Sequence, residues 1–272
     1  MSATCAIIAG AGAFPRHAAR EAKRRGLSVV AFGLQGWADP ALAGDVDRYE
    51  EIDIGQLGGL IERLKTHRIR QAIMAGKVTK GILLDPRVRF DAEALKVLST
   101  VKDASVNSVL GAIGQRLAAE GITLLDSSIF LRDCLCPAGV LTAQRPSPSE
   151  ESDIQVGVQA ARQLAALDIG QTVVVKARVI VAVEALEGTD AAIRRAASLA
   201  GAGTVVVKTA SPTQDMRFDL PVLGRQTIVV ARETGVRVIA VEAGKTLLLD
   251  REALIAQANE ASLCLVGIEP AA

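Results

Sequence analysis

Short apolar runs alternate with amphipathic stretches along this chain, and that alternation restricts the fold more than any other feature. The runs "CAIIA" (5–9) and "LSVVAFG" (27–33) are typical of buried strands. The stretch 14–26 between them has helical spacing, with Pro15 in its first turn. Strands that alternate with helices form parallel sheets joined by right-handed crossovers. We therefore predict an α/β fold.

The same pattern continues to residue 131. Apolar runs predict three further strands, and amphipathic stretches predict three more helices. A parallel sheet built in this order indicates a Rossmann-like domain over residues 1–131. The expected strands are 49–54, 71–78 and 122–127, and the expected helices are 56–68, 91–100 and 107–121.

Residues 132–150 interrupt the alternation and are predicted to be a linker. The stretch is rich in Pro, Ser and charged residues, a composition typical of loops. A helix is expected to follow it, with Ser149 or Ser152 as the N-cap.

Residues 151–272 are predicted to form a second α/β domain. Two strands are expected within 171–188, with a turn near Lys176, and such hairpin-like pairs indicate a mixed sheet. The other expected elements are helices at 150–170, 189–201 and 251–261, and strands at 203–209, at 263–269 and, as a pair, within 236–250.

Composition excludes several classes of protein. The net charge of +1 and the aromatic content of 3% argue against nucleic-acid binding, which needs basic surfaces and stacking platforms. Scattered cysteines without a His cluster favour reduced thiols over zinc or disulfides. No segment has the length of a signal sequence or a bilayer span, so we expect a cytoplasmic protein. The cysteines are Cys5, Cys134, Cys136 and Cys264.

Two glycine-rich turns follow predicted strands. Gly10, Ala11 and Gly12 open a helix, where backbone N–H groups can approach a phosphate, although a simple tight turn is the alternative. Gly76 and Lys77 likewise follow a predicted strand, and Lys77 either binds phosphate or is a solvated loop lysine. The third glycine of a dinucleotide fingerprint is replaced by Pro15, and no acidic residue ends the second strand. These turns therefore do not predict NAD binding.

A second candidate lies in "VEALEGTDAAIRRA". Glu184 and Glu187 follow a predicted strand, and Gly188, Thr189 and Asp190 open a helix. A helix start can bind an anion, and the acids could hold a divalent cation beside it. The alternative, favoured by these residues alone, is that Thr189 and Asp190 simply cap the helix.

The strongest candidate is "KTASPTQDMRFDLPVLG", which begins at Lys208. If it is extended, Asp215, Arg217 and Asp219 share one face, and Met216 and Phe218 share the other. A structural salt bridge is the simple explanation, but buried ion clusters add little net stability. Carboxylates that hold magnesium or orient water, beside an arginine that neutralises phosphate, favour a functional site.

These motifs resemble the LpxI family, the UDP-2,3-diacylglucosamine diphosphatases of lipid A biosynthesis. The C-terminal likeness lies in "LDIGQTVVVKARVIVAVEALEGTDAAIRR", in the segment around Asp219 and in "VIAVEAGKTLLLDRE"; "IAGAGAFP", "ADP" and "AGKV" carry the N-terminal likeness. The resemblance implies that residues 151–272 are the catalytic domain. It also implies hydrolysis to 2,3-diacylglucosamine 1-phosphate (lipid X) and UMP, with Mg²⁺ or another divalent cation and water attack at the β-phosphorus.

The resemblance also implies roles for individual residues. Asp219 is the expected metal ligand or water-positioning group, with Asp215 as a second metal ligand, and Arg217 and Lys208 complete the catalytic set. The expected substrate-binding residues are Gly10, Ala11, Gly12, Gly76, Lys77, Glu187, Gly188, Thr189, Asp190 and Gln214. Where the family often carries "GDD", this chain has "KDASVNSVL", so no catalytic residue is assigned there.

The resemblance further implies a lipid-linked UDP-sugar as substrate, transient contact with the inner-membrane surface and a possible homodimer. The alternative from another class is a non-hydrolytic, Rossmann-like regulator that binds a nucleotide or UDP-sugar. An NAD-dependent oxidoreductase is disfavoured, because His17 and His67 both lie on predicted helices or at their ends.

Overall fold

The chain folds into two compact units, which are described separately. The first unit contains the chain up to Arg132 together with the described residues 215–218, and the second contains the remainder. The structure, a computed structural model, describes residues 3–78, 81–82, 85–101, 105–211, 214–218 and 220–270.

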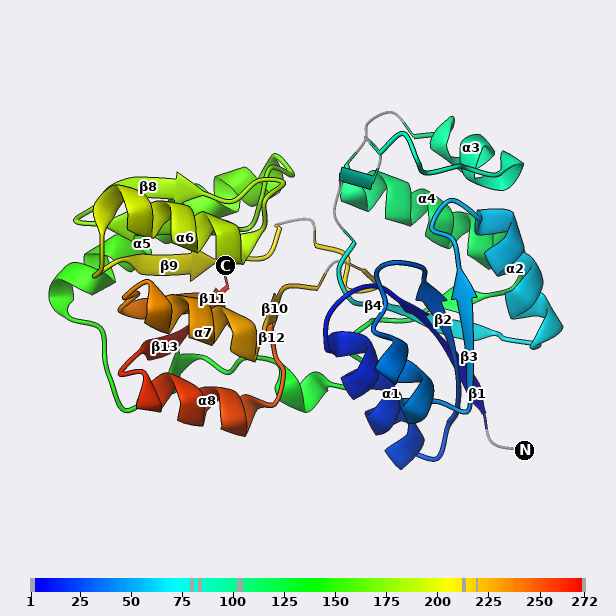
Figure 1. Ribbon diagram of the computed structural model, residues 1–272, viewed down its shortest axis with the longest axis horizontal. Helices are drawn as coiled ribbons and strands as arrows, with labels where there is room; N and C mark the ends of the chain where they lie inside the picture. Colours follow the sequence, from blue (N-terminus) through cyan, green and yellow to red (C-terminus); the bar gives the residue numbers. More distant parts are fainter. Residues whose placement is uncertain are drawn as a thin grey trace. The chain divides into compact units, whose positions relative to one another are not determined.

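The first unit is built on a five-stranded sheet in the order β3-β2-β1-β4-β5, and all of its pairings are parallel (Figure 1). The predicted parallel sheet is therefore confirmed. The chain leaves β1 toward β2 on one side and later returns to β4 on the other, so a topological switch point lies between β1 and β4. The strands are β1 (Thr4–Ala9), β2 (Ser28–Leu34), β3 (Arg48–Ile52), β4 (Gln71–Ala75) and β5 (Thr123–Leu124).

Helices cover both faces of this sheet. One face packs against α2, α3 and α4 in a core that includes the fully buried Phe32 and Leu64. The other face receives α1 through Ala18, Ala19 and Ala22, which have no exposed surface and so let the helix approach closely. The helices are α1 (Phe14–Arg24), α2 (Leu57–Thr66), α3 (Ala92–Leu98) and α4 (Val106–Ala119), with short 3₁₀ turns at η1 (Pro40–Asp45) and η3 (Arg132–Cys134).

The second unit contains a six-stranded mixed sheet in the order β6-β13-β11-β9-β7-β8. The strands β13, β11 and β9 run parallel, whereas β6, β7 and β8 each pair antiparallel with a neighbour. The predicted mixed sheet and the turn after Lys176 are both confirmed. The strands are β6 (Gly139–Val140), β7 (Thr172–Lys176), β8 (Val179–Val183), β9 (Val205–Lys208), β11 (Val238–Glu242) and β13 (Cys264–Ile268).

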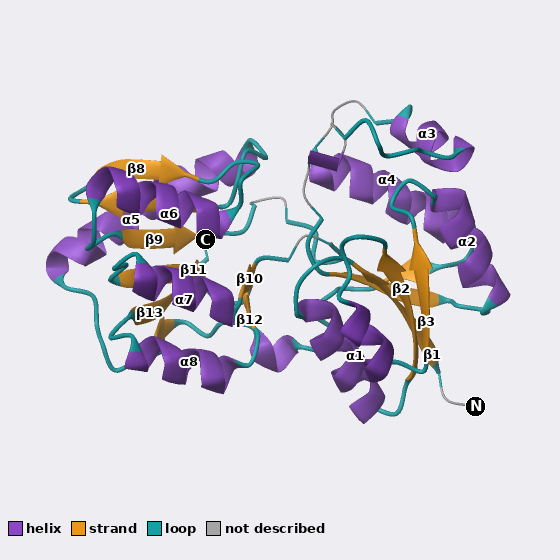
Figure 2. Cartoon of the chain, in the orientation of Figure 1, coloured by secondary structure: helices purple, strands orange, loops and turns teal. Residues whose placement is uncertain are grey.

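This sheet is also covered on both faces. The helix α5 packs on the face that carries Val205 and Val207, and α6, α7 and α8 pack on the face that carries Val206 and Val241 (Figure 2). Among the described residues, no helix combines the length and apolar character needed to cross a bilayer. The helices are α5 (Pro148–Ala166), α6 (Thr189–Ala200), α7 (Arg225–Glu233) and α8 (Arg251–Glu260).

Three local predictions for the second half are wrong or incomplete. The helix α5 starts earlier than expected, because Ser147 caps it and forms a capping box with Glu150. The run "TIVVA" is part of α7, an element that the apolar pattern did not predict. The pair expected within 236–250 is not a hairpin, since β12 (Leu247–Leu248) pairs parallel with β10 (Val222–Leu223) in a separate sheet.

The close contact between α5 and its sheet generates a stability prediction. A Cβ atom at Gly157 would overlap the buried side chain of Val207. We expect Gly157→Ala to lower the free energy of unfolding by about 1–2 kcal/mol in urea titration, because overpacking outweighs the gain in helix propensity. The control is Gly111→Ala in α4, where no described atom lies within 4 Å of the new methyl group. That change should be neutral or stabilising, and equal effects at both sites would contradict the packing argument.

Candidate active site

The segment that begins at Asp215 forms a tight turn. The amide of Phe218 donates to the Asp215 carbonyl at 3.1 Å, and the amide of Arg217 donates to Asp215 Oδ1 at 3.0 Å. A carboxylate that accepts from the amide two residues ahead favours a turn over a strand. The extended conformation considered from the sequence is therefore wrong, although Asp215 and Arg217 do point toward each other.

Asp215 and Arg217 form a bidentate ion pair. Arg217 Nε lies 3.0 Å from Oδ1 and Nη2 lies 2.6 Å from Oδ2 of the carboxylate. The hydrogen bonds from Arg217 hold the pKa of Asp215 below its ordinary value, and the same bonds raise the pKa of Arg217. The arginine side chain remains 43% exposed, so a ligand can reach its guanidinium group.

This ion pair is anchored to the sheet of the first unit. The amide of Ser127 donates to the Met216 carbonyl at 2.8 Å, and Ser127 Oγ lies 2.6 Å from the carbonyl oxygens of both Arg217 and Met74. Phe218 is 1% exposed, and the Arg217 guanidinium lies 5.4 Å from its ring centroid. The pair is therefore held at the carboxyl end of β4 and just beyond β5, the edge of a parallel sheet that usually binds ligands.

The two predicted glycine turns meet at the same edge. Gly10 N donates to the Ala75 carbonyl at 2.8 Å, while Ala11 and Lys77 exchange two backbone hydrogen bonds of 2.9 and 2.8 Å. A Cβ at Gly10 would lie 2.7 Å from the Lys77 carbonyl oxygen. Gly76 has φ +94°, and a Cβ built there would lie 2.7 Å from the Ala11 carbonyl oxygen. The close approach of the two backbones explains why both positions are glycine. The N–H groups of Gly10, Ala11 and Lys77 all donate to carbonyl oxygens of the protein.

Gly12 differs from Gly10 and Gly76. Its φ is +95°, and no described atom lies within 4 Å of a Cβ built there. Because it precedes the first turn of α1, a ligand can approach its backbone and the helix N-terminus from solvent. Lys77 is also exposed. The structure therefore brings all five N-terminal candidates to the carboxyl edge of the first sheet, the edge at which Asp215 and Arg217 are anchored.

A separate buried network lies at the carboxyl end of β9 in the second unit. Lys208, which is 8% exposed, places Nζ 3.0 Å from Thr189 Oγ1 and 3.4 Å from Thr172 Oγ1. The ammonium also lies 3.7 Å from Glu184 Oε2, and Thr189 donates to Glu184 Oε1 at 3.0 Å. These contacts join the ends of β8 and β9, the start of β7 and the start of α6.

The start of α6 departs from the capping interpretation. Gly188 is the N-cap, with φ +85° and no side-chain cap, while Thr189 belongs to the Lys208 network and Asp190 accepts from Thr227 Oγ1 at 2.8 Å. The proposal that Thr189 and Asp190 simply cap the helix is therefore wrong.

Of the two acids before α6, only Glu184 reaches the buried network. Glu187 forms an ion pair with Arg195 at 2.6 Å, which holds its pKa below the ordinary value. The sequence analysis named both acids as candidate cation ligands, but only Glu187 was among the expected substrate-binding residues. The sequence did contain a signal for Glu184. Side chains alternate between the two faces of a strand, and Glu184 lies two residues after the buried Ala182, so it continues the inward face of β8.

A second acid absent from the predicted set is Glu242 at the end of β11. It is 2% exposed, and its Oε2 accepts from the Ala210 amide at 2.8 Å, with Lys245 Nζ 3.5 Å from Oε1. Gln214, a predicted substrate-binding residue, accepts from the Ser211 amide at 3.2 Å. Glu242 and Gln214 therefore hold the backbone at Ala210 and Ser211, just after β9.

The described residues do not assemble the expected magnesium site. No group of three His, Cys, Asp or Glu side chains suited to a metal ion occurs among them. Asp215 directs both carboxylate oxygens to Arg217. The other expected ligand, Asp219, lies outside the described residues. The cation therefore remains a prediction.

Two of the four cysteines, Cys5 and Cys136, are unsuited to chemistry. Burial raises the pKa of Cys5 to about 11 and that of Cys136 to about 12. Both thiols stay protonated at neutral pH, which makes them poor nucleophiles and poor metal ligands.

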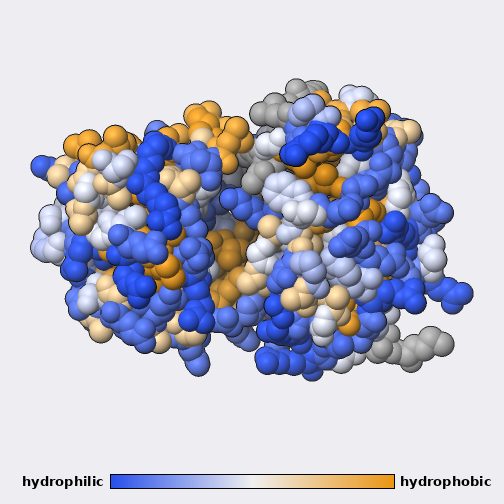
Figure 3. Space-filling model, viewed as in Figure 1, coloured by the Kyte–Doolittle hydropathy of each residue, from blue (hydrophilic) through white to orange (hydrophobic). Residues whose placement is uncertain are grey.

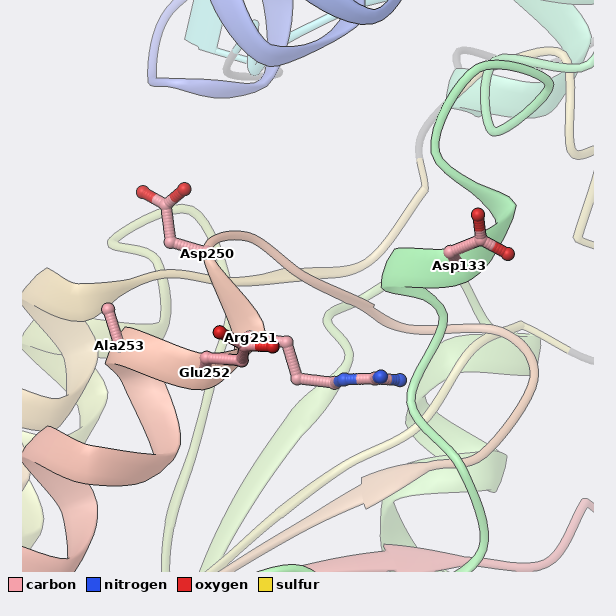
Figure 4. Close-up of a pocket in the computed structure, with 5 residues that line it drawn as sticks. All are labelled: Asp133, Asp250, Arg251, Glu252 and Ala253. Carbon is pink, nitrogen blue, oxygen red and sulfur yellow. The ribbon is translucent and has the colours of Figure 1, made fainter.

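A pocket in the second unit lies at the start of α8 and holds none of the predicted site residues (Figure 4). Its ionisable lining consists of three carboxylates and one guanidinium, and that balance does not favour an anionic diphosphate. The lining residues are Asp133, Asp250, Arg251, Glu252 and Ala253.

These features define a two-unit α/β protein whose candidate ligand-binding groups lie at the carboxyl ends of strands. The LpxI N-terminal domain family matches residues 4–134, and the LpxI C-terminal domain family matches residues 137–266. The chain is 33% identical over 277 residues to the UDP-2,3-diacylglucosamine pyrophosphatase LpxI of Caulobacter vibrioides, with 97% of each chain covered. The chain therefore belongs to the LpxI family, as its motifs predicted.

The ion pair in the turn predicts a pH-dependent contribution to stability. Because the pKa of Asp215 is lowered in the folded state, its contribution is present above the unfolded value of about 4 and is lost as the pH falls through the folded value. We expect Asp215→Asn to lower the free energy of unfolding by about 0.5–1 kcal/mol at pH 7, since the pair is partly exposed.

Urea titrations between pH 7 and pH 3 measure this dependence. The difference between the Asp215→Asn variant and the unmodified protein should shrink toward the acid end of the range. Glu233→Gln is the control, because the pair between Glu233 and Arg194 is about half exposed on both sides and should contribute less. A difference that grows as the pH falls would contradict the assigned direction of the pKa shift.

Proposed function

We propose that this chain hydrolyses UDP-2,3-diacylglucosamine to 2,3-diacylglucosamine 1-phosphate and UMP, a step of lipid A biosynthesis. Membership of the LpxI family and a near full-length match to a pyrophosphatase of that substrate support the proposal. The structural observation that carries it is the half-exposed Arg217, held by Asp215 at the ligand-binding edge of the first sheet.

Arg217 is suited to a diphosphate because a guanidinium group matches phosphate oxygens in a bidentate geometry. In the structure the same donors bind Asp215, which fixes the side chain in one orientation. A diphosphate competes with that carboxylate for the guanidinium. Asp215 therefore acts in this proposal as the group that orients Arg217 before substrate binds.

The proposed reaction is one displacement at phosphorus. A water oxygen forms a bond to the β-phosphorus, the bridging P–O bond breaks, and UMP leaves. In this scheme Asp219 orients the water, and Arg217 stabilises the charge that develops on the phosphoryl oxygens, the main task in phosphoryl transfer. Lys208 and the N-terminus of α6 contribute positive potential at the strand ends of the second unit.

We also propose a cytoplasmic protein that meets its lipid substrate through transient contact with the inner-membrane surface. Exposed apolar side chains of the second unit support this, and Figure 3 shows hydrophobic surface over the part of that unit that carries β8. The expected homodimer remains a prediction. The exposed apolar residues of the second unit are Leu167, Ile169, Val179, Ile180, Leu186 and Leu199.

The proposed function predicts that Asp219→Ala abolishes UMP release from UDP-2,3-diacylglucosamine, because the attacking water loses its orienting carboxylate. Arg217→Ala should lower kcat about 100-fold or more, and Arg217→Lys should restore only part of it, since a lysine lacks the bidentate fork. Product release is measured by chromatography of the nucleotide. Glu233→Gln is the matched surface control, and UMP release at the unmodified rate by Asp219→Ala would sink the assignment.

We further propose that turnover needs Mg²⁺ or another divalent cation. The expected ligands are Asp219 and, once the diphosphate has displaced it from Arg217, Asp215. Chelation with excess EDTA should then stop UMP release, and added Mg²⁺ should restore it, because a cation neutralises the diphosphate. Unchanged activity in EDTA would remove the cation from the scheme. A non-hydrolytic regulator that binds nucleotide or UDP-sugar predicts instead that substrate binds and no UMP appears under either condition.

A further inference from the structure

We propose that Ser127 is a positioning residue for hydrolysis, which fixes the backbone of the Asp215–Arg217 turn to the end of β4; this inference rests on the proposed function. Ser127 lies outside every candidate motif of the sequence. It is 1% exposed, and its three contacts reach two other segments: Met74, 53 residues away, and the turn that contains Met216 and Arg217, about 90 residues away.

The backbone contacts of Ser127 follow directly on the hydrogen bonds that pair β5 with β4. The amide of Leu125 donates to the Ala72 carbonyl at 2.8 Å, in line with the pairing of β5 and β4. Two residues later the amide of Ser127 donates at 2.8 Å to Met216 instead. The Met216 carbonyl thus accepts from the Ser127 amide in place of the Met74 carbonyl, which would be the next acceptor of β4 in this ladder.

The hydroxyl group of Ser127 adds a second attachment. It has one proton, and its oxygen lies 2.6 Å from the carbonyl oxygens of both Met74 and Arg217. A single buried donor therefore serves the end of β4 and the residue that carries the guanidinium. Removing it leaves two carbonyl groups without that donor, and buried acceptors without a donor are costly. The least costly response is a shift of the turn, which displaces Arg217.

The neighbouring Ser128 supplies a matched control. It is also 1% exposed, but its amide and hydroxyl both bond to Asp126 Oδ1, at 2.8 and 2.7 Å. Both bonds stabilise the serine's own turn rather than the segment 215–218. The two variants Ser127→Ala and Ser128→Ala thus remove the same hydroxyl from adjacent buried positions, and only the first removes an attachment of the Arg217 backbone.

The first arm of the test is kinetic, with UDP-2,3-diacylglucosamine as substrate and the full chain as enzyme. We expect Ser127→Ala to lower kcat about 10-fold or more with KM changed less than about 3-fold, and Ser128→Ala to stay within about 3-fold of the unmodified protein. In the Arg217→Ala background, Ser127→Ala should have little further effect, because its action passes through Arg217. If Ser127→Ala lowers kcat by the same factor in the Arg217→Ala background as in the unmodified protein, the proposal is overturned.

The second arm measures position without activity. Hydrogen exchange should accelerate at the amides of Arg217 and Phe218 in Ser127→Ala and stay unchanged there in Ser128→Ala. If Ser127→Ala fails to fold, Ser127→Cys, with a weaker donor of similar shape, takes its place in both arms. Unchanged exchange at both amides contradicts the positioning role. If the unmodified protein releases no UMP, the proposed function fails, and the exchange result still decides whether Ser127 holds the turn.

Discussion

The hydrogen bonds between Ser127 and the turn at 215–218 are the constraint on which the candidate site depends. They attach a segment from the second half of the sequence to the carboxyl edge of the first sheet. The ion pair of Arg217 with Asp215 is local to the turn and does not attach it to the sheet. The buried Phe218 adds apolar attachment to the same anchor.

Two of the candidate cations, Arg217 and Lys208, lie in different surroundings. Arg217 is half exposed and pairs with one carboxylate, so its guanidinium can exchange partners when an anion arrives. Lys208 is buried among two hydroxyl groups and Glu184, where desolvation makes an exchange of partners costly. This difference fits a direct contact with phosphate for Arg217. For Lys208 it fits a role in holding the strand ends and the start of α6 in place.

Local chemistry made much of the fold predictable. The β-branched runs of β7 and β9 and the turn after Lys176 follow from period and composition. The errors in the predicted elements arise where tertiary packing, or a second residue of the same type, competed with the local sequence signal. The run in α7 contains the β-branched residues that strands favour, yet tertiary packing of Ile228 and Val230 makes it helical. Ser149 and Ser152 carry the same hydroxyl, but Ser147 caps α5. It directly precedes Pro148 in the first turn and forms a capping box with Glu150.

The sequence by itself determined the alternation of strands and helices, the two-part organisation, the glycine turns and the family. It also determined the local pairing of Asp215 with Arg217. Only the tertiary structure decided that their turn joins the first unit, that Glu184 rather than Glu187 meets Lys208, and that Ser127 and Glu242 support the strand ends. The physical reason is range: periodicity and capping act over a few residues, whereas these contacts depend on how strands pair and which residues are buried together.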